Sequence, residues 1–307
     1  MQGSVRNNIA LTNLSIQYKN AEYIAGQFVK DIPVIKDNDK YFIYNDDYRL
    51  PDTYRANKAL ANMYTFGVST STYSVNQHAL KDIITNTDRE NTDSPLDLDR
   101  DTVELLTDKL MLRYEYDCHS LLFTTTTFSN NATLTSNTSW LYHTVTSAPI
   151  QNVLSASSYI IQQSGKTPNV GVTNIDVYMA LRENPNVYGR IQYVERAILT
   201  KEILAALFDI DQLYVGSAII DAALEGNTAS KSLIWGGHFL LGYFDPSPGL
   251  RKVTAAANFR VTEFGTPMSV KKWFDEDVDG DYIEVRTKYK AQAIATLCGY
   301  LIKSCAL

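Results

Sequence analysis

The run SGKT at Ser164–Thr167 has the ending of a phosphate-binding loop. Such a loop needs G-x-x-x-x-G-K-[ST] between a strand and a helix, because its glycines let backbone N–H groups surround the phosphates. Here Ile160 occupies the position of the first glycine, a helical pattern precedes the run, and a proline follows it. We therefore interpret Gly165 as the residue that ends a helix, with Lys166 near the negative end of its dipole.

The run DEDVDGDYIEVR at Asp275–Arg286 resembles a calcium-binding loop, with aspartates at alternate positions and Gly280 at the sixth. A calcium loop requires a bidentate glutamate at the twelfth position, where this chain has Arg286. No helical pattern leads into the run either. The run is therefore predicted to be a solvated hairpin turn.

The remaining polar residues form no recognisable catalytic set. The histidines stand in four different segments without metal-ligand spacing (His78, His119, His143 and His238), and three cysteines are too few and scattered for a zinc site or a disulfide framework. The sequence contains no G-x-S-x-G, H-E-x-x-H or G-x-G-x-x-G motif. It predicts no catalytic residue, no cofactor-binding residue and no metal site, and hence no cofactor and no enzyme activity.

Length and composition narrow the class of protein. The chain has 307 residues, enough for one large or two modest domains, and 28 basic against 34 acidic residues, a net charge of −6. Its basic residues form no cluster that could grip nucleic acid. No apolar run approaches the ~18 residues of a membrane span, and the first residues lack a signal-peptide core. We expect a protein made in the cytoplasm, without membrane association or sequence-specific DNA binding.

The segment Ser94–Phe123 is predicted to be one long helix, about 35 Å at ~1.5 Å per residue. Asp97 or Asp99 can accept backbone N–H bonds at its start. Its apolar stripe recurs at steps of three and four: Val103, Leu106, Leu110, Tyr114, Cys118 and Leu121, widened on one side by Leu105, Leu112, Tyr116 and His119. Most globular domains have much shorter helices, so this one must span a large part of its domain.

Two regions before this helix have too little apolar surface to fold alone. Residues 1–37 contain scattered apolar positions without a sustained period, which predicts an arm. Residues 38–97 pair a short strand at Tyr41–Tyr44 with a long alternating segment after Gly67, and a polar excursion separates them. This pattern predicts a protruding hairpin. Because an isolated hairpin is marginal in water, we expect it to lie across a neighbouring molecule.

After the long helix, strands and helices alternate as in a compact α/β unit. A polar loop or edge strands are predicted for 123–140, helices for 150–163, 175–182 and 201–208, and strands for 170–174, 213–219 and 239–244. Two closing strands, 269–275 and 281–295, flank the acidic turn, and 300–302 ends the chain.

Several segments match one protein family in the family's own order. They are NTDSPLDLDRDTVELLTDKLMLRYE (Asn91–Glu115), ILAALFDIDQLYVGSAI (Ile203–Ile219), IWG (Ile234–Gly236), DPSPGLR (Asp245–Arg251), WFDEDVDGDYIEVRTKYKAQAIA (Trp273–Ala295) and GYLIKS (Gly299–Ser304). These segments resemble the spine helix, apical segments and closing strands of major capsid proteins of tailed double-stranded-DNA phages. The resemblance covers most of residues 21–307.

The resemblance implies an α+β fold of the Hong Kong 97 type. Its parts would be an N-terminal arm (1–37), an extended β-hairpin loop (38–97), a peripheral domain with the long spine helix (98–149 and 263–307), and an α/β axial domain (150–262). It implies a structural virion protein that self-assembles as pentamers and hexamers into an icosahedral head shell around the phage DNA.

The same resemblance implies partners and a location. The partners would be identical subunits, a portal protein at one vertex and decoration proteins. Scaffolding would come from a separate protein or would not be needed, because many relatives begin with a long helical scaffolding segment and this chain has none. The protein would be made in the host bacterial cytoplasm and reside in the virion capsid.

The extended loop carries residue types that are enriched at subunit contacts. The predicted contacts with a neighbouring subunit are Pro51, Tyr54, Arg55, Lys58, Tyr64 and Phe66. Some relatives join a lysine of this loop covalently to an asparagine of a neighbour. Lys58 and Lys81 lie in the loop here, but no motif identifies a partner asparagine.

Two other functions remain open. An encapsulin-like bacterial compartment would have a similar architecture but hold enzyme cargo, and purified particles with DNA and a portal would exclude it. A soluble α/β enzyme built on the axial unit would sediment as a small oligomer, whereas a shell protein would form capsomers or megadalton particles.

Overall fold

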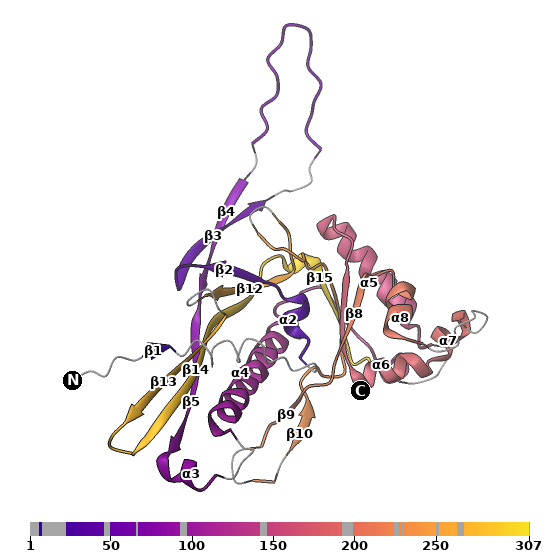
Figure 1. Ribbon diagram of the computed structural model, residues 1–307. Helices are drawn as coiled ribbons and strands as arrows, with labels where there is room; N and C mark the ends of the chain where they lie inside the picture. Colours follow the sequence, from indigo (N-terminus) through magenta and orange to yellow (C-terminus); the bar gives the residue numbers. More distant parts are fainter. Residues whose placement is uncertain are drawn as a thin grey trace.

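Two β-sheets share one long helix, and a hairpin loop projects from the body of the molecule (Figure 1). The structure is a computed structural model. It describes residues 6–7, 23–45, 50–65, 67–92, 97–141, 146–191, 199–223, 227–228, 230–249, 252–262 and 267–306. Apart from β1 (Arg6–Asn7), residues 1–22 of the predicted arm lie outside this part of the chain.

The first sheet is built around β14 (Gly280–Ala293). Its antiparallel neighbours are β13 (Met268–Asp275), β5 (Asn76–Thr85) and β12 (Ala256–Val261); β2 (Asp31–Val34) pairs in parallel with β12, and β1 extends β13. Alternate β14 residues from Ile283 to Ala291 are buried, as the period of two along a strand requires. A turn joins β13 to β14 in the acidic run, so the predicted hairpin turn is confirmed.

The predicted long helix is α4 (Leu98–Leu122). Asp97 precedes it, and the Asp97 carboxylate accepts the backbone N–H of Arg100 at 3.3 Å, one of the two predicted caps. The start of its apolar stripe packs on the first sheet: Val103, Leu106 and Leu110 against Val270, Ile283 and Val285. This contact sets the rotation of the helix about its axis.

The prediction about the wider part of that stripe was wrong for two of its four residues. Leu105 is 53% exposed and Tyr116 is also exposed, whereas Leu112 and His119 are partly buried. Thr107, Glu115 and Leu122, which were not predicted to be part of the stripe, are buried. The reason is that the helix packs against residues 23–29 and the second sheet as well as the first, so its buried arc extends toward these partners.

The second sheet has the order β6 (Asn131–Thr133), β15 (Gly299–Lys303), β11 (Phe239–Gly242), β7 (Val170–Asn174) and β8 (Gln212–Gly216). The helices around it are α5 (Pro149–Ser164), α6 (Ile175–Glu183), α7 (Pro185–Ile191) and α8 (Lys201–Leu207). Buried side chains of these elements and of the loops next to them, Trp140, Phe208 and Phe239 among them, form one hydrophobic cluster. Gly165, with φ of 63°, ends α5, which confirms the interpretation of SGKT as a helix terminus.

The strand predicted at 213–219 is two strands. β8 ends at Gly216, and β9 (Ile219–Asp221) leaves the sheet to pair with β10 (Lys231–Leu233). A Cβ atom at Gly216 would lie 2.2 Å from the Trp235 ring, so only glycine lets the indole pack against the end of β8.

Hydrogen bonding assigns three strands differently from the predicted domain boundaries. β6 and β15 fall in the range predicted as peripheral, yet both lie in the second sheet. β12 falls in the predicted axial range, yet it pairs with β14 in the first sheet. The chain crosses between the sheets at these points, and the partners of a crossing strand are far away in the sequence.

The projecting loop rises from β3 (Asn38–Asn45) and β4 (Gly67–Ser74), which pair antiparallel. The alternating segment after Gly67, predicted as one strand, is divided at Val75: β4 belongs to the hairpin, and β5 belongs to the first sheet. Tyr73 stacks on Phe259 at 4.6 Å and joins the base of the loop to β12. Three short helices were not predicted, α2 (Ala25–Phe28), α3 (Asn86–Glu90) and α7, nor was the short 3₁₀ turn η1 (Thr296–Cys298).

Candidate subunit-contact surfaces

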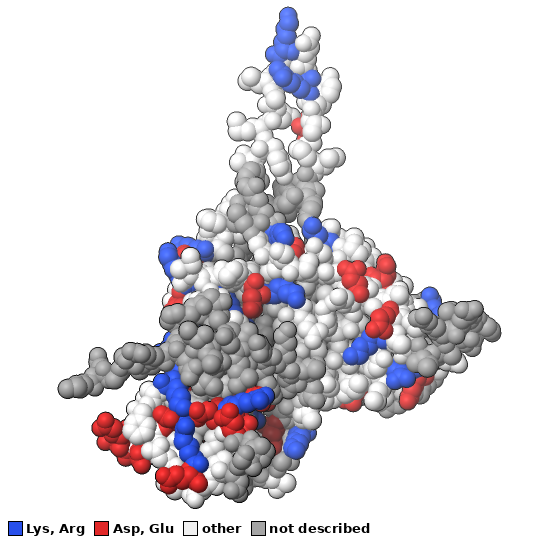
Figure 2. All heavy atoms as spheres, viewed as in Figure 1, with Lys and Arg blue, Asp and Glu red and all other residues white. Residues whose placement is uncertain are grey.

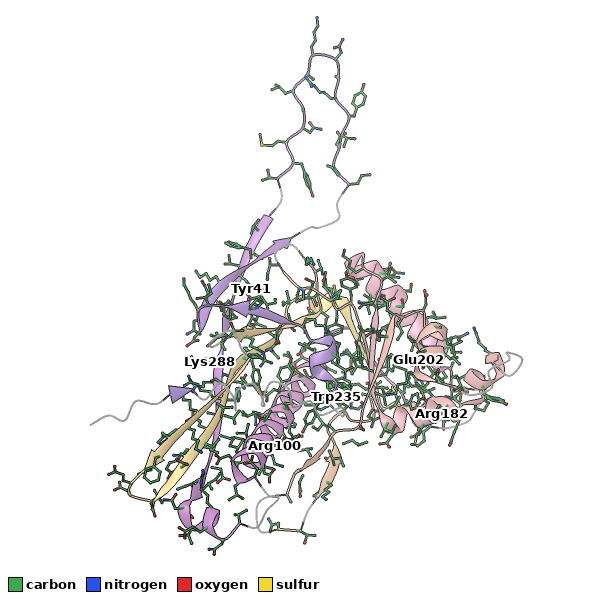
Figure 3. The ribbon with its side chains drawn as sticks, viewed as in Figure 1. Tyr41, Arg100, Arg182, Glu202, Trp235 and Lys288 are labelled. Atoms are coloured by element: carbon green, nitrogen blue, oxygen red, sulfur yellow. The ribbon has the colours of Figure 1, made fainter. Side chains whose placement is uncertain are left out.

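The loop at 50–65 stands clear of the rest of the molecule (Figure 3). Every residue in this range is exposed, including large apolar side chains: Leu60 and Met63 are each 93% exposed and Leu50 is 97% exposed. Burying one such side chain is worth about 1.5–3 kcal/mol. Several large apolar side chains exposed on one loop are typical of a surface that another molecule covers.

The structure places five of the six predicted contact residues together on this loop. Tyr54 and Tyr64 are exposed, as are Pro51, Arg55 and Lys58. The turn at the tip is closed by the backbone N–H of Ala59, which donates to the carbonyl of Ala56 at 3.1 Å, and Lys58 has a positive φ of 63°. The sixth predicted residue, Phe66, lies outside the described residues. Contact of these side chains with a neighbouring subunit remains a prediction.

Opposite charges gather at the two ends of the molecule. Figure 2 shows basic side chains at the tip of the loop, where Arg55 and Lys58 lie, and acidic side chains at the far end of the first sheet. That end is the turn between β13 and β14, with Glu276 and Asp277 exposed. A head-to-tail contact between identical copies would bring unlike ends together, and such contacts close into rings when the rotation allows.

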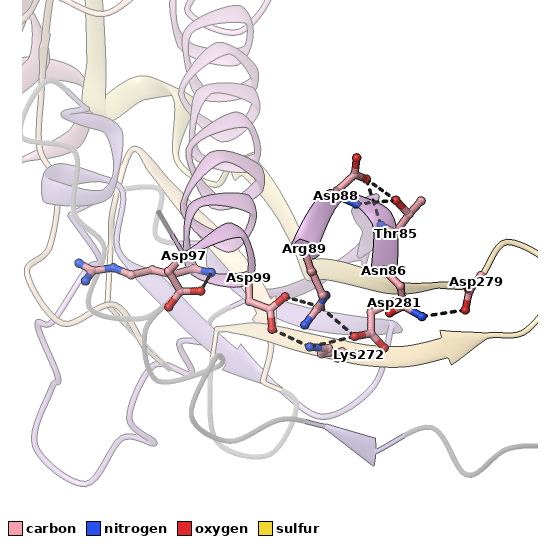
Figure 4. Close-up of polar contacts among 10 residues, drawn as sticks. Thr85, Asn86, Asp88, Arg89, Asp97, Asp99, Lys272, Asp279 and Asp281 are labelled. Atoms are coloured by element: carbon pink, nitrogen blue, oxygen red, sulfur yellow. Dashed lines mark hydrogen bonds and ion pairs between the residues drawn. The ribbon is translucent and has the colours of Figure 1, made fainter. Parts of the chain in front are cut away.

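A network of four charged groups fixes the start of α4 on the first sheet (Figure 4). The Arg89 guanidinium lies 2.7 Å from a carboxylate oxygen of Asp99 and 2.8 Å from one of Asp281. The Lys272 ammonium contacts the same two carboxylates at 2.6 and 3.2 Å. The groups come from α3, α4, β13 and β14 and are only partly exposed, so the four elements are held together more firmly than by isolated surface pairs.

Replacing Lys272 with alanine should lower the free energy of unfolding by about 1 kcal/mol, because both carboxylates lose a partner within a network. The matched control is Arg100→Ala, which removes one exposed pair with Glu104 on α4 and should cost clearly less, because water screens an exposed pair. Urea unfolding of the unassembled chain at low and high salt measures both. An equal cost for the two variants would show that the network adds nothing to single pairs.

The carboxylate of Glu115 lies at the junction of three segments. It is fully buried and accepts the backbone N–H of Ile24 at 3.0 Å, the backbone N–H of Ala25 at 2.9 Å, and the indole N–H of Trp235 at 2.5 Å. Burial raises the pKa of Glu115, and the three hydrogen bonds oppose that rise by favouring the charged form. Figure 3 shows Trp235 beside α4 and α2.

Two histidines lie next to this junction. The His119 ring meets the Trp235 ring edge-on at 5.7 Å, and His238 accepts the backbone N–H of Ser304 at Nδ1, 3.0 Å away. Burial, with a smaller contribution from His238, lowers the pKa of His119 to about 4. Within the described part of the chain, the buried Nδ1 of His119 has no hydrogen-bond partner, which also disfavours the charged ring.

The stability of the chain should therefore fall in acid. His119 has an ordinary pKa of 6.5 when unfolded, so the unfolded state binds its proton first, and the contribution of the neutral ring is lost between pH 6.5 and pH 4. His119→Gln should remove about 2 kcal/mol of this pH dependence, as measured by urea unfolding at pH 7 and pH 4.5. His78→Gln is the control and should retain most of it. Identical pH profiles for wild type and His119→Gln would contradict the assignment.

The part of the chain that the structure describes contains no group of three or more His, Cys, Asp or Glu side chains placed to bind a metal ion. None of the helices described there is long and apolar enough to cross a membrane. His143 lies outside the described residues.

Sequence analysis missed Glu115, Arg89 and Lys272. A signal for Glu115 exists in hindsight, since a lone carboxylate next to an apolar stripe of a long helix must find donors if the stripe is buried. The network around Lys272 had no such signal, because its members are far apart in the sequence and come together only through strand pairing.

Comparison with known proteins finds two sequence relatives, and both have the same name. No protein-family model matches the chain. It is 26% identical over 235 residues to a protein of Burkholderia phage BcepMu named major capsid protein, covering 76% of this chain and 75% of the relative. It is 24% identical over 241 residues to a major capsid protein of Pseudomonas phage JBD67, covering 76% of each chain.

Solved structures agree on the fold. A phage-related protein from Bordetella bronchiseptica RB50 superposes with a TM-score of 0.78 at 19% identity, covering 99% of both chains. The capsid protein of cyanophage P-SCSP1u has a TM-score of 0.61 at 8% identity, covering 99% of this chain and 91% of that one. An encapsulin of Synechococcus elongatus has a TM-score of 0.53 at 10% identity, covering 97% of this chain and 95% of that one.

The predicted fold class is therefore confirmed: helices and strands are mixed in the arrangement of Hong Kong 97-type capsids and encapsulins. The fold alone does not distinguish phage capsid proteins from encapsulins, whereas both sequence relatives are named major capsid protein. Sequence relatives and fold together identify the chain as a homologue of tailed-phage major capsid proteins, with the Hong Kong 97-type capsid fold.

Proposed function

We propose that this chain is the structural subunit of a phage head, assembling with identical copies as pentamers and hexamers into an icosahedral shell around double-stranded DNA. The observation that carries the proposal is the loop at 50–65, whose apolar side chains are exposed on the single chain and have no core of their own to enter. In a shell each loop can be covered by a neighbouring copy. Many weak contacts of this kind together stabilise the shell, since every ~1.4 kcal/mol of free energy in one contact changes its association equilibrium tenfold.

The contact residues on the loop would be Pro51, Tyr54, Arg55, Lys58 and Tyr64, together with Phe66. The basic tip suits the acidic turn at the opposite end of another copy, where Glu276 and Asp277 are exposed. In this arrangement the first sheet and α4 form the peripheral part, and the second sheet with α5–α8 forms the axial part around five- and six-fold axes. The strands β6 and β15 then belong to the axial part because they pair there.

The finer partners are also part of the proposal. A portal protein would occupy one vertex, scaffolding would come from a separate protein, and decoration proteins would bind outside. The DNA would be enclosed without sequence-specific binding, which a net charge of −6 suits because a strongly basic lining would retain the polymer. The role is structural and non-enzymatic, and the chain would be made in the host bacterial cytoplasm before it enters the virion.

An encapsulin-like compartment is the second candidate, favoured only by the fold. Two relatives named major capsid protein favour the phage head. A soluble α/β enzyme accounts for neither the relatives nor the projecting loop.

Electron microscopy and analytical sedimentation of the expressed full chain test the proposal. We expect capsomers or closed icosahedral particles, and particles from infected or induced cells should contain DNA and a portal at one vertex. Particles that contain a cargo enzyme and no portal would support the compartment instead. A chain that stays monomeric at all concentrations would refute both shells.

A further inference from the structure

The buried carboxylate of Glu115 is an unexplained feature of the fold. A carboxylate loses its hydration when buried, and its hydrogen bonds must compensate. No described Lys or Arg side chain forms an ion pair with Glu115, and all three of its hydrogen bonds come from uncharged donors: Ile24, Ala25 and Trp235. For stability alone, well-packed apolar residues commonly do as well as a buried charge. Such a group can instead select one arrangement of the segments that it joins.

The first of these segments begins where the N-terminal residues meet the body. Phe28 packs in an aromatic cluster, with its ring 5.9 Å from Trp235, 5.2 Å from Phe244 and 5.6 Å from Tyr214. Ala25 is also buried. These apolar contacts favour burial of the segment, but they are not directional. They therefore do not fix how the segment is oriented on the body, and the polar contacts do.

The polar contacts fix that orientation. Glu115 accepts two successive backbone N–H groups, of Ile24 and Ala25, one with each carboxylate oxygen. About two turns earlier on α4, the Asp108 carboxylate accepts the Tyr23 hydroxyl at 2.9 Å. Two carboxylates of one helix thus hold three consecutive residues, 23–25, in one position on α4.

Trp235 links the same carboxylate to the second sheet. Its indole N–H donates to the Glu115 oxygen that also accepts from Ile24. Its ring is buried against Gly216, the last residue of β8, and lies 5.2 Å from the Phe123 ring just after α4. A shift of α4 relative to the second sheet would therefore disturb the hydrogen bonds that hold residues 24 and 25.

We propose that Glu115 is a positioning residue, which fixes residues 23–25 on α4 and couples their position to the packing of α4 on the second sheet. Its consequence for assembly rests on the function proposed above: every copy then holds this segment in the same position, so neighbouring copies meet equivalent surfaces. The local coupling itself does not depend on assembly.

Hydrogen exchange of the unassembled full chain tests the coupling. Glu115→Gln keeps the side-chain volume but replaces an accepting oxygen with an NH₂ group that cannot accept. We expect at least tenfold faster exchange at Ile24 and Ala25, equivalent to about 1.4 kcal/mol, with exchange in β7 unchanged. The indole N–H resonance of Trp235 should move toward the position of a weaker hydrogen bond. Glu104→Gln, on the same helix but in a pair with Arg100, is the control and should alter neither readout.

Two results would overturn the coupling. One is unchanged exchange at residues 24 and 25 in Glu115→Gln, and the other is an equal loss of protection in β7, which would mean a role in global stability only. If Glu115→Gln does not fold, Glu115→Asp takes its place, because it retains the charge but shortens the side chain by one methylene. The same two exchange results would then overturn the coupling. Failure of both variants to fold would also refute a local positioning role.

The yield of closed particles is measured in a separate experiment. We expect Glu115→Gln to give fewer than one tenth of the closed particles that the wild type gives, and Glu104→Gln to match the wild type. Fast exchange at residues 24 and 25 combined with wild-type particle yield would refute the consequence for assembly and leave the coupling intact. Absence of particles from the wild type would instead count against the proposed function, and the exchange result would still stand.

Discussion

Replacing residues 50–64 with a short Gly–Ser linker should leave a folded chain that no longer forms closed particles. The fold should survive because every residue from 50 to 65 is exposed and none belongs to a buried hydrophobic cluster. The paired strands β3 and β4 keep their register, and shortening a flexible loop changes its closure entropy by less than about 1 kcal/mol. Sedimentation velocity and electron microscopy measure the loss of particles, and circular dichroism measures the retained fold.

A milder pair of variants separates loss of the loop from loss of its apolar contacts. Leu60→Ser with Met63→Ser removes two side chains that are each 93% exposed and should reduce particle yield at least tenfold. Met179→Ser on α6 removes another exposed apolar side chain, remote from the loop, and serves as the matched control. Normal particles from the loop deletion would refute the role of the loop in assembly.

Arg260→Ala should lower the free energy of unfolding by about 3 kcal/mol. The side chain is 8% exposed, and its guanidinium lies 2.8 Å from a carboxylate oxygen of Asp31 on β2. It also lies 5.4 Å from the Tyr114 ring centre and 5.6 Å from that of Tyr289, and it donates to the Thr287 hydroxyl at 3.0 Å. Truncation removes the ion pair and both cation–π contacts and leaves a cavity between α4 and the first sheet.

The control for Arg260 is Arg182→Ala. Arg182 on α6 has its guanidinium 5.8 Å from the Tyr178 ring centre, a similar contact, but it is exposed (Figure 3). Its removal should cost less than about 0.5 kcal/mol, because water screens the contact and replaces it. Urea unfolding of the unassembled chains compares the two. Equal costs would show that burial does not strengthen the Arg260 contacts.

Local patterns in the sequence predicted most elements correctly. The strand at 170–174 was predicted with its observed bounds, and α4, α5, α6 and α8 within a few residues of their observed ends. These elements have a strong apolar period and clear end signals, such as Asp97 before α4 and Gly165 after α5. Both signals act between residues a few positions apart, so one sequence suffices to recognise them.

The features that local patterns did not predict share a different cause. The division of the segment after Gly67 into β4 and β5, the placement of β6, β12 and β15, and the buried side of α4 all depend on partners far away in the chain. A strand carries no local mark of the sheet that it joins, because its alternation is the same in either sheet.

For the candidate contact surface, local composition is enough to predict the essential feature. A polar excursion between two strands, with scattered large side chains, cannot form a core, so residues 50–65 had to project. The contacts that hold the body together became visible in the folded chain: Glu115 meets Ile24, Ala25 and Trp235, and Arg89 and Lys272 share Asp99 and Asp281. Exposure follows from local composition, whereas a buried or paired charge needs partners that the packing of distant segments brings within hydrogen-bonding distance.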